Sequence, residues 1–237
     1  MSVSPPEVLR ASNLHAFYGE SHVLHGINFS ARRGELVTLL GRNGAGRTTT
    51  LKALIGLVGQ RSGSVVINGH ETVSMPTYKI ARLGVGYCPE ERGIFTSLSA
   101  LENFLLPPTI AEGGMTVDEI HDMFPNLRER QSISGARLSG GEQQMLALAR
   151  ILRTGAQILL LDEITEGLAP VLVKSLSTAV RVLKKRGYTI VLTEQNFRFT
   201  EHIADRHYVI EHGRVVHTVE RTALEANMPQ LRRMLGL

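Results

Sequence analysis

A glycine-rich loop is the first feature of this sequence whose residue types and spacing could do chemistry. The apolar residues 36–40 before the loop predict a strand, and the apolar spacing of residues 51–55 after it predicts a helix. Glycines let backbone N–H groups converge on phosphate oxygens, and the amino end of a helix adds a favourable dipole. This order predicts a phosphate-binding P-loop, the Walker A motif, with contacts from Asn43, Gly44, Ala45, Gly46, Arg47, Thr48 and Thr49.

The loop departs from the usual P-loop pattern at Arg47, where that pattern has lysine. Positive charge is kept, but a planar guanidinium fork replaces a compact ammonium. We therefore expect the contact with the β- and γ-phosphates to change in geometry. Taken alone, these residues also fit an ordinary glycine-rich turn before a helix, and the other motifs of the chain are needed to decide between the two interpretations.

Two acidic residues follow a second apolar segment, residues 158–161. In a parallel sheet the carboxyl ends of the strands form the ligand-binding edge, so Asp162 and Glu163 are expected beside the P-loop. Asp162 can hold Mg²⁺ together with the Thr48 hydroxyl, and Glu163 can polarise the attacking water. The pair therefore predicts a metal-binding acidic motif of the Walker B type beside the P-loop, which is a better interpretation than an ordinary acidic strand end.

A third motif, Leu-Ser-Gly-Gly-Glu-Gln at residues 138–143, opens a long helical pattern. Ser139 has the side chain of a helix N-cap, and Gly140 and Gly141 allow a close approach of the backbone, so the helix offers a second anion site. Ordinary capping explains Ser139 alone. Together with the P-loop and the acidic pair, the motif predicts a composite nucleotide site.

The elements that must position these residues change in character along the chain. Strands and turns dominate residues 8–40, and the Asn68-Gly69 pair predicts a hairpin. Residues 97–153 fit helices, and strands and helices alternate after residue 158, as in a parallel sheet covered by helices. The predicted fold class is α/β: a P-loop NTPase core of a mixed sheet with flanking helices and an N-terminal antiparallel β region. One domain is expected over residues 8–237, with a helical lobe inserted at about residues 97–153.

Composition and charge limit the class of protein. The 237 residues are 43% hydrophobic and 20% charged, as in soluble globular proteins, and no apolar run spans a membrane or forms a signal peptide, so a cytoplasmic location is expected. Cys88 is the single cysteine, which excludes an internal disulfide and suits a buried small hydrophobe. The net charge is +4, but the basic residues are scattered, so no nucleic acid partner is expected.

Taken together, the motifs resemble the nucleotide-binding subunit of ATP-binding-cassette transporters over nearly the whole chain. Residues 138–143 are similar to the signature motif of that family, its most specific mark. The resemblance implies that two subunits pair head to tail on two ATP molecules. Ser139, Gly140 and Gly141 of one subunit would then contact the γ-phosphate held by the P-loop of the other, and hydrolysis would require a dimer.

The resemblance also implies roles for residues outside these motifs. Tyr18 resembles the aromatic residue that stacks on adenine, although packing equally explains a tyrosine after Phe17. Glu90 stands where the family usually has a glutamine that contacts Mg²⁺ and water, and a carboxylate there can ligate Mg²⁺ but adds negative charge near the phosphates. Gln195 stands where most members have a histidine that reaches the γ-phosphate, and an amide donates a hydrogen bond but does not titrate. The implied sets are Glu163, Gln195 and Glu90 for catalysis and Thr48, Asp162 and Glu90 for the metal.

Two further departures from the family pattern lie after the acidic pair. Ile164 replaces the usual proline, and residues 166–169 lack the aspartate that is common in the loop coupling the two sites. None of the departures removes a required charge. An active ATPase, with a slow rate as one possibility, is therefore expected ahead of a non-hydrolysing regulatory subunit.

Several of these departures occur together in one subfamily. Residues 41–46, 89–95, 165–170 and 194–196 resemble the smaller ATPase subunit of high-affinity branched-chain amino-acid importers, which implies uptake of leucine, isoleucine or valine. The related importers of urea and short-chain amides are an alternative, because no residue here touches the solute. A soluble cassette ATPase of translation or DNA repair is a second alternative, although such proteins carry two cassettes or a long coiled-coil insertion and this chain shows neither.

The same resemblance implies a set of partners. They are two integral-membrane permease subunits, a sister ATPase subunit and a periplasmic solute-binding protein, with this chain at the cytoplasmic face of the inner membrane. A homodimer is possible in isolation. Residues 78–106, which flank Glu90, would supply the groove for a coupling helix of the permease.

Overall fold

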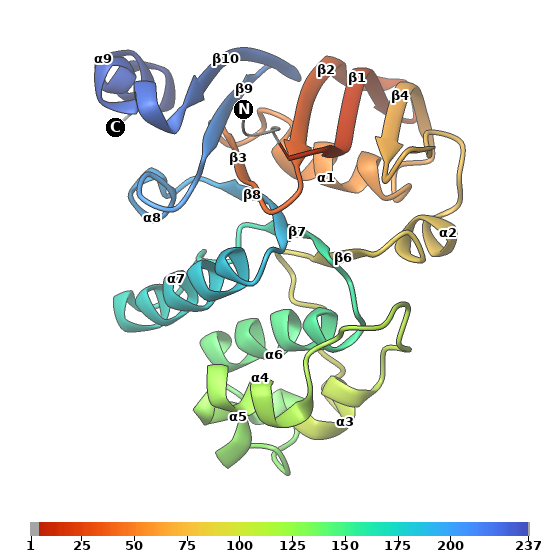
Figure 1. Cartoon of the computed structure of the whole chain (residues 1–237), viewed down its shortest axis with the longest axis vertical. Coiled ribbons are helices and arrows are strands. Elements are labelled where there is room, and N and C mark those ends of the chain that lie inside the picture. The colour runs from red at the N-terminus through yellow and green to blue at the C-terminus, as the bar shows by residue number, and fades with distance from the viewer. Residues whose placement is uncertain (1–4, 237) are drawn as a thin grey trace.

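The computed structural model describes residues 5–236, which form two β-sheets with helices between and around them (Figure 1). The strands are β1 (Glu7–Tyr18), β2 (Ser21–Arg32), β3 (Leu36–Leu40), β4 (Gln60–Ile67), β5 (His70–Glu71), β6 (Val85–Cys88), β7 (Ile158–Asp162), β8 (Thr189–Glu194), β9 (Arg206–Glu211) and β10 (Arg214–Glu220). The α-helices are α1 (Arg47–Leu54), α2 (Thr77–Ala81), α3 (Ala100–Leu105), α4 (Val117–Met123), α5 (Pro125–Glu129), α6 (Gly140–Arg153), α7 (Pro170–Lys185), α8 (Phe197–Thr200) and α9 (Leu224–Leu235). Short 3₁₀ turns cover Gly135–Arg137 and Arg221–Ala223.

The first sheet is antiparallel, in the order β2-β1-β4-β5. One of its faces packs over α1, because Leu14 and Ala16 of β1 are fully buried and α1 contacts both β1 and β2. The predicted hairpin is confirmed: Asn68 and Gly69 have φ values of 48° and 81°, and Ile67 pairs with His70 across the turn.

The second sheet has the order β10-β9-β3-β8-β7-β6, and all its neighbours are parallel except β10, which is antiparallel to β9. Every residue of β3, β7 and β8 is buried, as expected for central strands covered on both faces. Because β3, β8 and β7 are adjacent and parallel, their carboxyl ends meet at one edge. The P-loop, Asp162 and Glu194 all lie at that edge.

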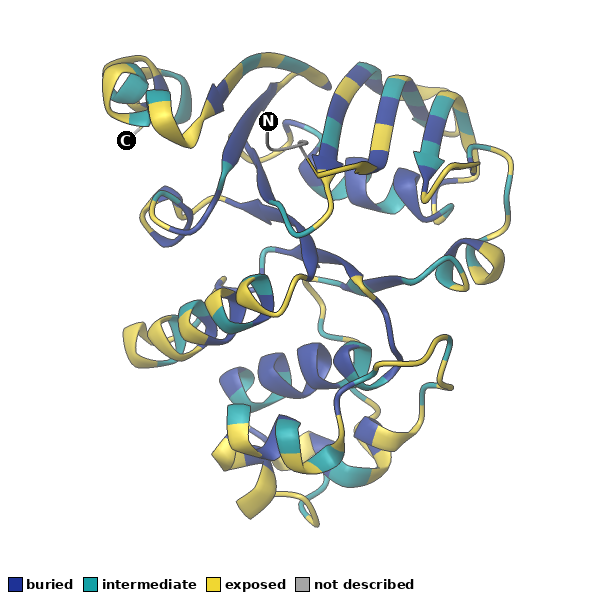
Figure 2. Ribbon diagram, in the orientation of Figure 1, coloured by how far each residue is buried: buried dark blue, intermediate teal, exposed yellow. Residues whose placement is uncertain are grey.

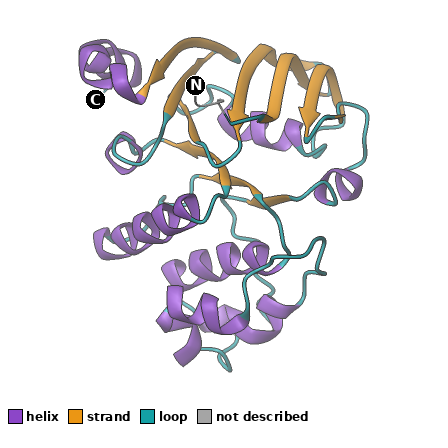
Figure 3. Cartoon of the chain, in the orientation of Figure 1, coloured by secondary structure: helices purple, strands orange, loops and turns teal. Residues whose placement is uncertain are grey.

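Helices α3 to α7 gather at one end of the molecule, and most of the strands lie at the other end with α1, α8 and α9 beside them (Figure 3). The segment predicted as an inserted helical lobe contains α3 to α6, and its status as a separate lobe stays a prediction. Most of α6 is buried (Figure 2). Its buried side chains belong to a hydrophobic core that includes Cys88 and continues to α7. Cys88 itself is fully buried, as expected.

The carboxyl-terminal helix, α9, packs on the outer part of the second sheet. Leu231 of α9 is fully buried in a small cluster with Leu40 and Val219. Within residues 5–236, no helix combines the length and the apolar character needed to cross a membrane. The predicted α/β P-loop NTPase fold, with its antiparallel N-terminal sheet, is confirmed.

Candidate nucleotide site

The P-loop connects β3 to α1 and leaves the amino end of α1 without a side-chain cap. Gly46 is the N-cap residue, with a φ of 106°, and a Cβ atom there would lie 2.9 Å from Leu24 Cδ2. Only glycine adopts this conformation without strain. The first N–H groups of α1 are therefore available to an anion, as in phosphate-binding loops.

A cavity of about 340 Å³ opens at this helix end. It is lined by Val23, the P-loop residues 43–49, and three carboxylates, Glu90, Glu163 and Glu166. A larger cavity, of about 560 Å³, lies at the amino ends of β6, β7 and β8, and its lining within residues 5–236 includes none of the predicted site residues. The smaller cavity is the candidate site because phosphate-binding groups and carboxylates converge there.

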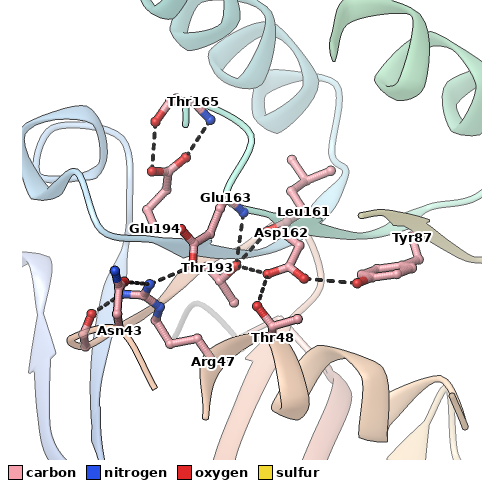
Figure 4. A network of polar contacts seen from close by, with 11 residues as sticks. Asn43, Arg47, Thr48, Tyr87, Leu161, Asp162, Glu163, Thr165, Thr193 and Glu194 are labelled. Carbon is pink, nitrogen blue, oxygen red and sulfur yellow. Dashed lines mark hydrogen bonds and ion pairs between the residues drawn. The ribbon is translucent and has the colours of Figure 1, made fainter. Parts of the chain in front are cut away.

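Asp162, at the end of β7, is fully buried and holds three hydroxyl groups (Figure 4). Its Oδ1 accepts hydrogen bonds from Thr48 Oγ1 at 3.0 Å and Thr193 Oγ1 at 2.6 Å, and its Oδ2 accepts one from Tyr87 Oη at 3.0 Å. Burial raises the pKa of Asp162, although the three hydrogen bonds act in the opposite direction. The predicted Thr48–Asp162 pair is thus in place, and a carboxylate with a hydroxyl is a donor set that fits Mg²⁺.

Arg47 lies inside the P-loop and pairs with Glu163. The Arg47 Nη2 is 2.6 Å from Glu163 Oε1, and the two side chains are 4% and 11% exposed. The guanidinium also donates to the Gly41 carbonyl and, at 3.3 Å, to Asn43 Oδ1. The group predicted to contact phosphate is therefore bound here to the acceptors of the loop and to the predicted catalytic carboxylate.

Glu163 is held in an unusual backbone conformation. Its φ is 44°, in the left-handed region that residues with a side chain seldom adopt. Its N–H donates to the Thr193 carbonyl at 3.1 Å and to the Thr193 hydroxyl at 3.2 Å. The side chain consequently points into the cavity beside the P-loop (Figure 4).

Glu90 lies with Glu163 and Glu166, since one carboxylate oxygen of each is within 4.8 Å of the others. Burial, followed by the charges of Glu163 and Asp162, raises the pKa of Glu90. This position is compatible with the predicted role of Glu90 near the metal and the attacking water. Glu166 was not among the predicted site residues, although it stands in the loop directly after the acidic pair.

The structure does not bring every predicted residue to this cavity. Tyr18 ends β1 and is 48% exposed, and Gln195 is exposed directly after β8; in the described part of the chain, neither lines the cavity. Ser139 caps α6, accepting from Glu142 N–H at 3.3 Å. The amino end of α6 lies in the helical half of the molecule, away from α1 (Figure 1). The nucleotide roles of these residues stay predictions.

Gly141 has a packing role in addition to the one predicted for it. A Cβ atom at this position would overlap the Leu172 side chain at the start of α7. The glycine therefore allows α6 and α7 to approach closely, which the sequence pattern did not indicate.

Besides Glu166, three further residues that help to build the site were not identified from the sequence. Thr193 and Tyr87 bind Asp162, and Glu194 accepts hydrogen bonds from Thr165. Tyr87 lies on β6 and the other two lie on β8, so all three are on the strands that flank β7, at or near their carboxyl ends. These residues could be identified only from the strand order β8-β7-β6, which the sequence motifs do not give.

The fold and the site together define an ATPase of the P-loop class. The family model for "ABC transporter" matches residues 24–166. The chain therefore belongs to the ABC transporter family, as an ATP-binding cassette.

Individual relatives agree with this assignment. The chain is 36% identical over 228 residues to the high-affinity branched-chain amino acid transport ATP-binding protein BraG of Pseudomonas aeruginosa, covering 95% of this chain and 97% of the relative. It is 35% identical to the probable branched-chain amino acid transport ATP-binding protein LivF of Archaeoglobus fulgidus, covering 88% and 90%. It is also 33% identical to the lipopolysaccharide export system ATP-binding protein LptB of Haemophilus influenzae, covering 89% and 90%.

Solved structures show the same fold. A nucleotide-free ATP-binding cassette from an ABC transporter matches with a TM-score of 0.82 at 20% identity, covering 98% of this chain and 99% of that one. The dimeric cassette MJ0796 bound to ADP and Pi matches with a TM-score of 0.77 at 22% identity, covering 90% and 98%. At these identities the likeness establishes the fold alone.

Proposed function

We propose that this chain is the ATP-hydrolysing subunit of an importer for branched-chain amino acids and powers transport through separate membrane subunits. The observation that carries the proposal is the arrangement at the ends of β3 and β7. Thr48 is bonded to Asp162, and Glu163 lies beside the P-loop. The similarity to BraG and LivF, over most of each chain, supports the choice of cargo.

The geometry suggests a division of roles in hydrolysis. The phosphates of ATP would bind at the uncapped amino end of α1, and the Thr48 hydroxyl and Asp162 carboxylate would hold Mg²⁺. The ion, when bound, offsets the negative charge of the phosphates. Glu163 accepts a hydrogen bond from the attacking water, Gln195 donates one to the γ-phosphate, and Tyr18 stacks on adenine.

Arg47 changes partners when ATP binds. Phosphate oxygens compete with the Glu163 carboxylate for the guanidinium, and a charged fork binds phosphate strongly. Transfer of Arg47 to the phosphates releases Glu163 toward the water. The same side chain therefore links occupation of the P-loop to the availability of the catalytic carboxylate.

A second cassette completes the site. The amino end of α6, which carries Ser139, Gly140 and Gly141, lies away from α1 of the same chain (Figure 1). This separation supports a head-to-tail pair in which the three residues face the partner's γ-phosphate. In the importer the partner is a sister ATPase, and a homodimer serves in isolation. The dimeric state of a cassette with the same fold supports this arrangement.

Exposed apolar side chains support a contact with permeases. Tyr78, Phe95, Leu105 and Leu106 are 60%, 50%, 46% and 52% exposed and lie within the segment that flanks Glu90. Two permease subunits would dock there and place the chain at the cytoplasmic face of the inner membrane, with a periplasmic binding protein supplying the solute.

The similarity to LptB favours a second candidate, an ATPase of a lipopolysaccharide export system. Urea and short-chain amide importers stay a further alternative for the cargo. A soluble cassette without permeases is the remaining alternative.

The test is mild detergent extraction of native membranes with MgATP, followed by affinity capture of the tagged chain and mass spectrometry. We expect mass spectrometry to identify two permeases and a second ATPase. The genes of these partners should lie beside a gene for an amino-acid-binding protein. Phe95→Asp should lose the permeases, whereas Val216→Asp, which changes a similarly exposed residue on β10, should keep them. Capture of lipopolysaccharide export components, or of no membrane protein, would contradict the proposal while leaving the ATPase assignment intact.

A further inference from the structure

A buried carboxylate joins the end of β8 to the loop that follows Glu163. Glu194 is 2% exposed, and both of its carboxylate oxygens bind one residue. Oε1 accepts the Thr165 N–H at 3.1 Å, and Oε2 accepts the Thr165 hydroxyl at 2.8 Å (Figure 4). Thr165 is also buried, so this double contact is shielded from water.

This contact is one of several hydrogen bonds that join the end of β8 to residues 162–165. Thr193, one residue before Glu194, pairs with Asp162 and binds the Glu163 N–H through its carbonyl and hydroxyl oxygens. Glu194 then binds Thr165, beyond the end of β7. Two consecutive residues of β8 therefore hold Asp162, Glu163 and Thr165 in turn.

The segment that is held in this way is strained. Glu163 has a φ of 44°, and such a conformation persists only where the surrounding structure enforces it. The Thr193 bonds restrain the residue on one side, and the Glu194–Thr165 contact restrains the chain two positions later. Glu166, which follows Thr165, lines the same cavity as Glu163, so the restraint also sets where that carboxylate lies.

We propose that Glu194 is a positioning residue for ATP hydrolysis. By holding Thr165 it keeps residues 163–166 in the conformation that directs the Glu163 carboxylate into the P-loop cavity. Glu194 touches neither Arg47 nor the P-loop in the bonds that the described residues make, so it acts through Thr165. The inference rests on the ATPase part of the proposed function and is independent of the cargo.

The first test measures amide exchange of Thr165 in the full chain without nucleotide, so its outcome does not depend on turnover. Glu194→Ala should speed exchange of the Thr165 N–H at least tenfold, because that hydrogen bond is lost. Glu35→Gln is the matched control: Glu35 is a largely buried carboxylate 2.6 Å from Arg206 Nη2, at the opposite edge of the sheet. Unchanged protection of Thr165 in Glu194→Ala would overturn the proposal.

The second test is steady-state ATP hydrolysis. Glu194→Ala should lower kcat about 10- to 100-fold, with the KM for MgATP within about threefold, since misplacement of a catalytic group acts on the chemical step. Glu194→Gln, which keeps one acceptor oxygen, should recover part of the loss, and Glu35→Gln should retain the rate of the unchanged chain.

Thr165→Val removes the hydroxyl with little change in shape. If Glu194→Ala does not fold, Thr165→Val tests the same contact in its place. The double variant should be no slower than the slower single variant, because both act on one contact. The proposal would be overturned if the losses of kcat in the two single variants multiply in the double variant. It would also be overturned if Glu194→Ala folds and keeps the full kcat. If the unchanged chain hydrolyses no ATP, either alone or with its partners, the result would instead contradict the ATPase part of the proposed function.

Discussion

The guanidinium of Arg47 and the carboxylate of Glu163 lie 2.6 Å apart, and both side chains are nearly excluded from water. The pair joins the residue that departs from the usual P-loop pattern to the residue expected to activate water. A buried charge is stable only when it is paired, so each of these groups needs the other, and we propose that phosphate takes the place of the carboxylate when ATP binds. Substitution of Arg47 or Glu163 should therefore change nucleotide binding or hydrolysis, and both can be measured on the isolated chain.

Arg47→Ala should weaken MgATP binding by about 10- to 100-fold, because the charged contact with the phosphates is lost and the carboxylates of Glu163, Glu90 and Glu166 are left uncompensated. Fluorescence titration with a labelled nucleotide measures the change. Arg181→Ala, at an exposed position on α7, is the control and should bind normally. Equal affinity of Arg47→Ala and the unchanged chain would rule out a phosphate contact by Arg47.

Asp162→Asn should abolish the part of nucleotide affinity that depends on Mg²⁺. The substitution keeps the size of the side chain but removes the charge that Mg²⁺ needs, so affinity with Mg²⁺ should fall about 10- to 100-fold. Affinity in excess EDTA should change little. Isothermal titration with and without Mg²⁺ makes the comparison, and Asp122→Asn, at a solvent-exposed position, is the control. A Mg²⁺ effect of unchanged size in Asp162→Asn would place the metal elsewhere.

His207 should make stability depend on pH. It is fully buried, its Nδ1 lies 2.7 Å from Thr38 Oγ1, and burial lowers its pKa to about 4. The unfolded chain, with an ordinary pKa of about 6.5, binds the proton more readily, so stability is lost as pH falls through the range from about 6.5 to 4. Between pH 7 and pH 5 the loss due to this residue should be about 2 kcal/mol.

Urea unfolding of the unchanged chain and of His207→Gln at both pH values tests this expectation. The glutamine keeps a partner for Thr38 but does not titrate, so it should lose less stability on acidification. Comparison of the two chains cancels other titrating groups, including Glu194, whose pKa burial raises to about 8 and whose effect on stability has the opposite sign. Equal losses in both chains would show that His207 is not the group responsible.

Much of the site follows from local sequence. The strand, glycine loop and helix around Gly46 are consecutive, and the acidic pair ends an apolar strand, so both could be predicted and Thr48 does meet Asp162. The pairing of Glu194 with Thr165 could not, because it depends on β8 lying beside β7 and joins residues 29 positions apart. The orientation of Arg47 could not be predicted either, since its ion pair with Glu163 joins residues that are far apart in the sequence and brought together only by the sheet.

The central claim is that Glu163 at the end of β7 supports ATP hydrolysis at the P-loop. Single-turnover hydrolysis of radiolabelled ATP, with nucleotide binding measured in parallel, tests it most directly on the unchanged chain, Glu163→Gln and the control Glu225→Gln, whose side chain is exposed on α9. Glu163→Gln should bind MgATP yet hydrolyse it at least about 100-fold more slowly, as expected when a group acting on the attacking water is lost. Hydrolysis by Glu163→Gln at the rate of the unchanged chain would contradict the account.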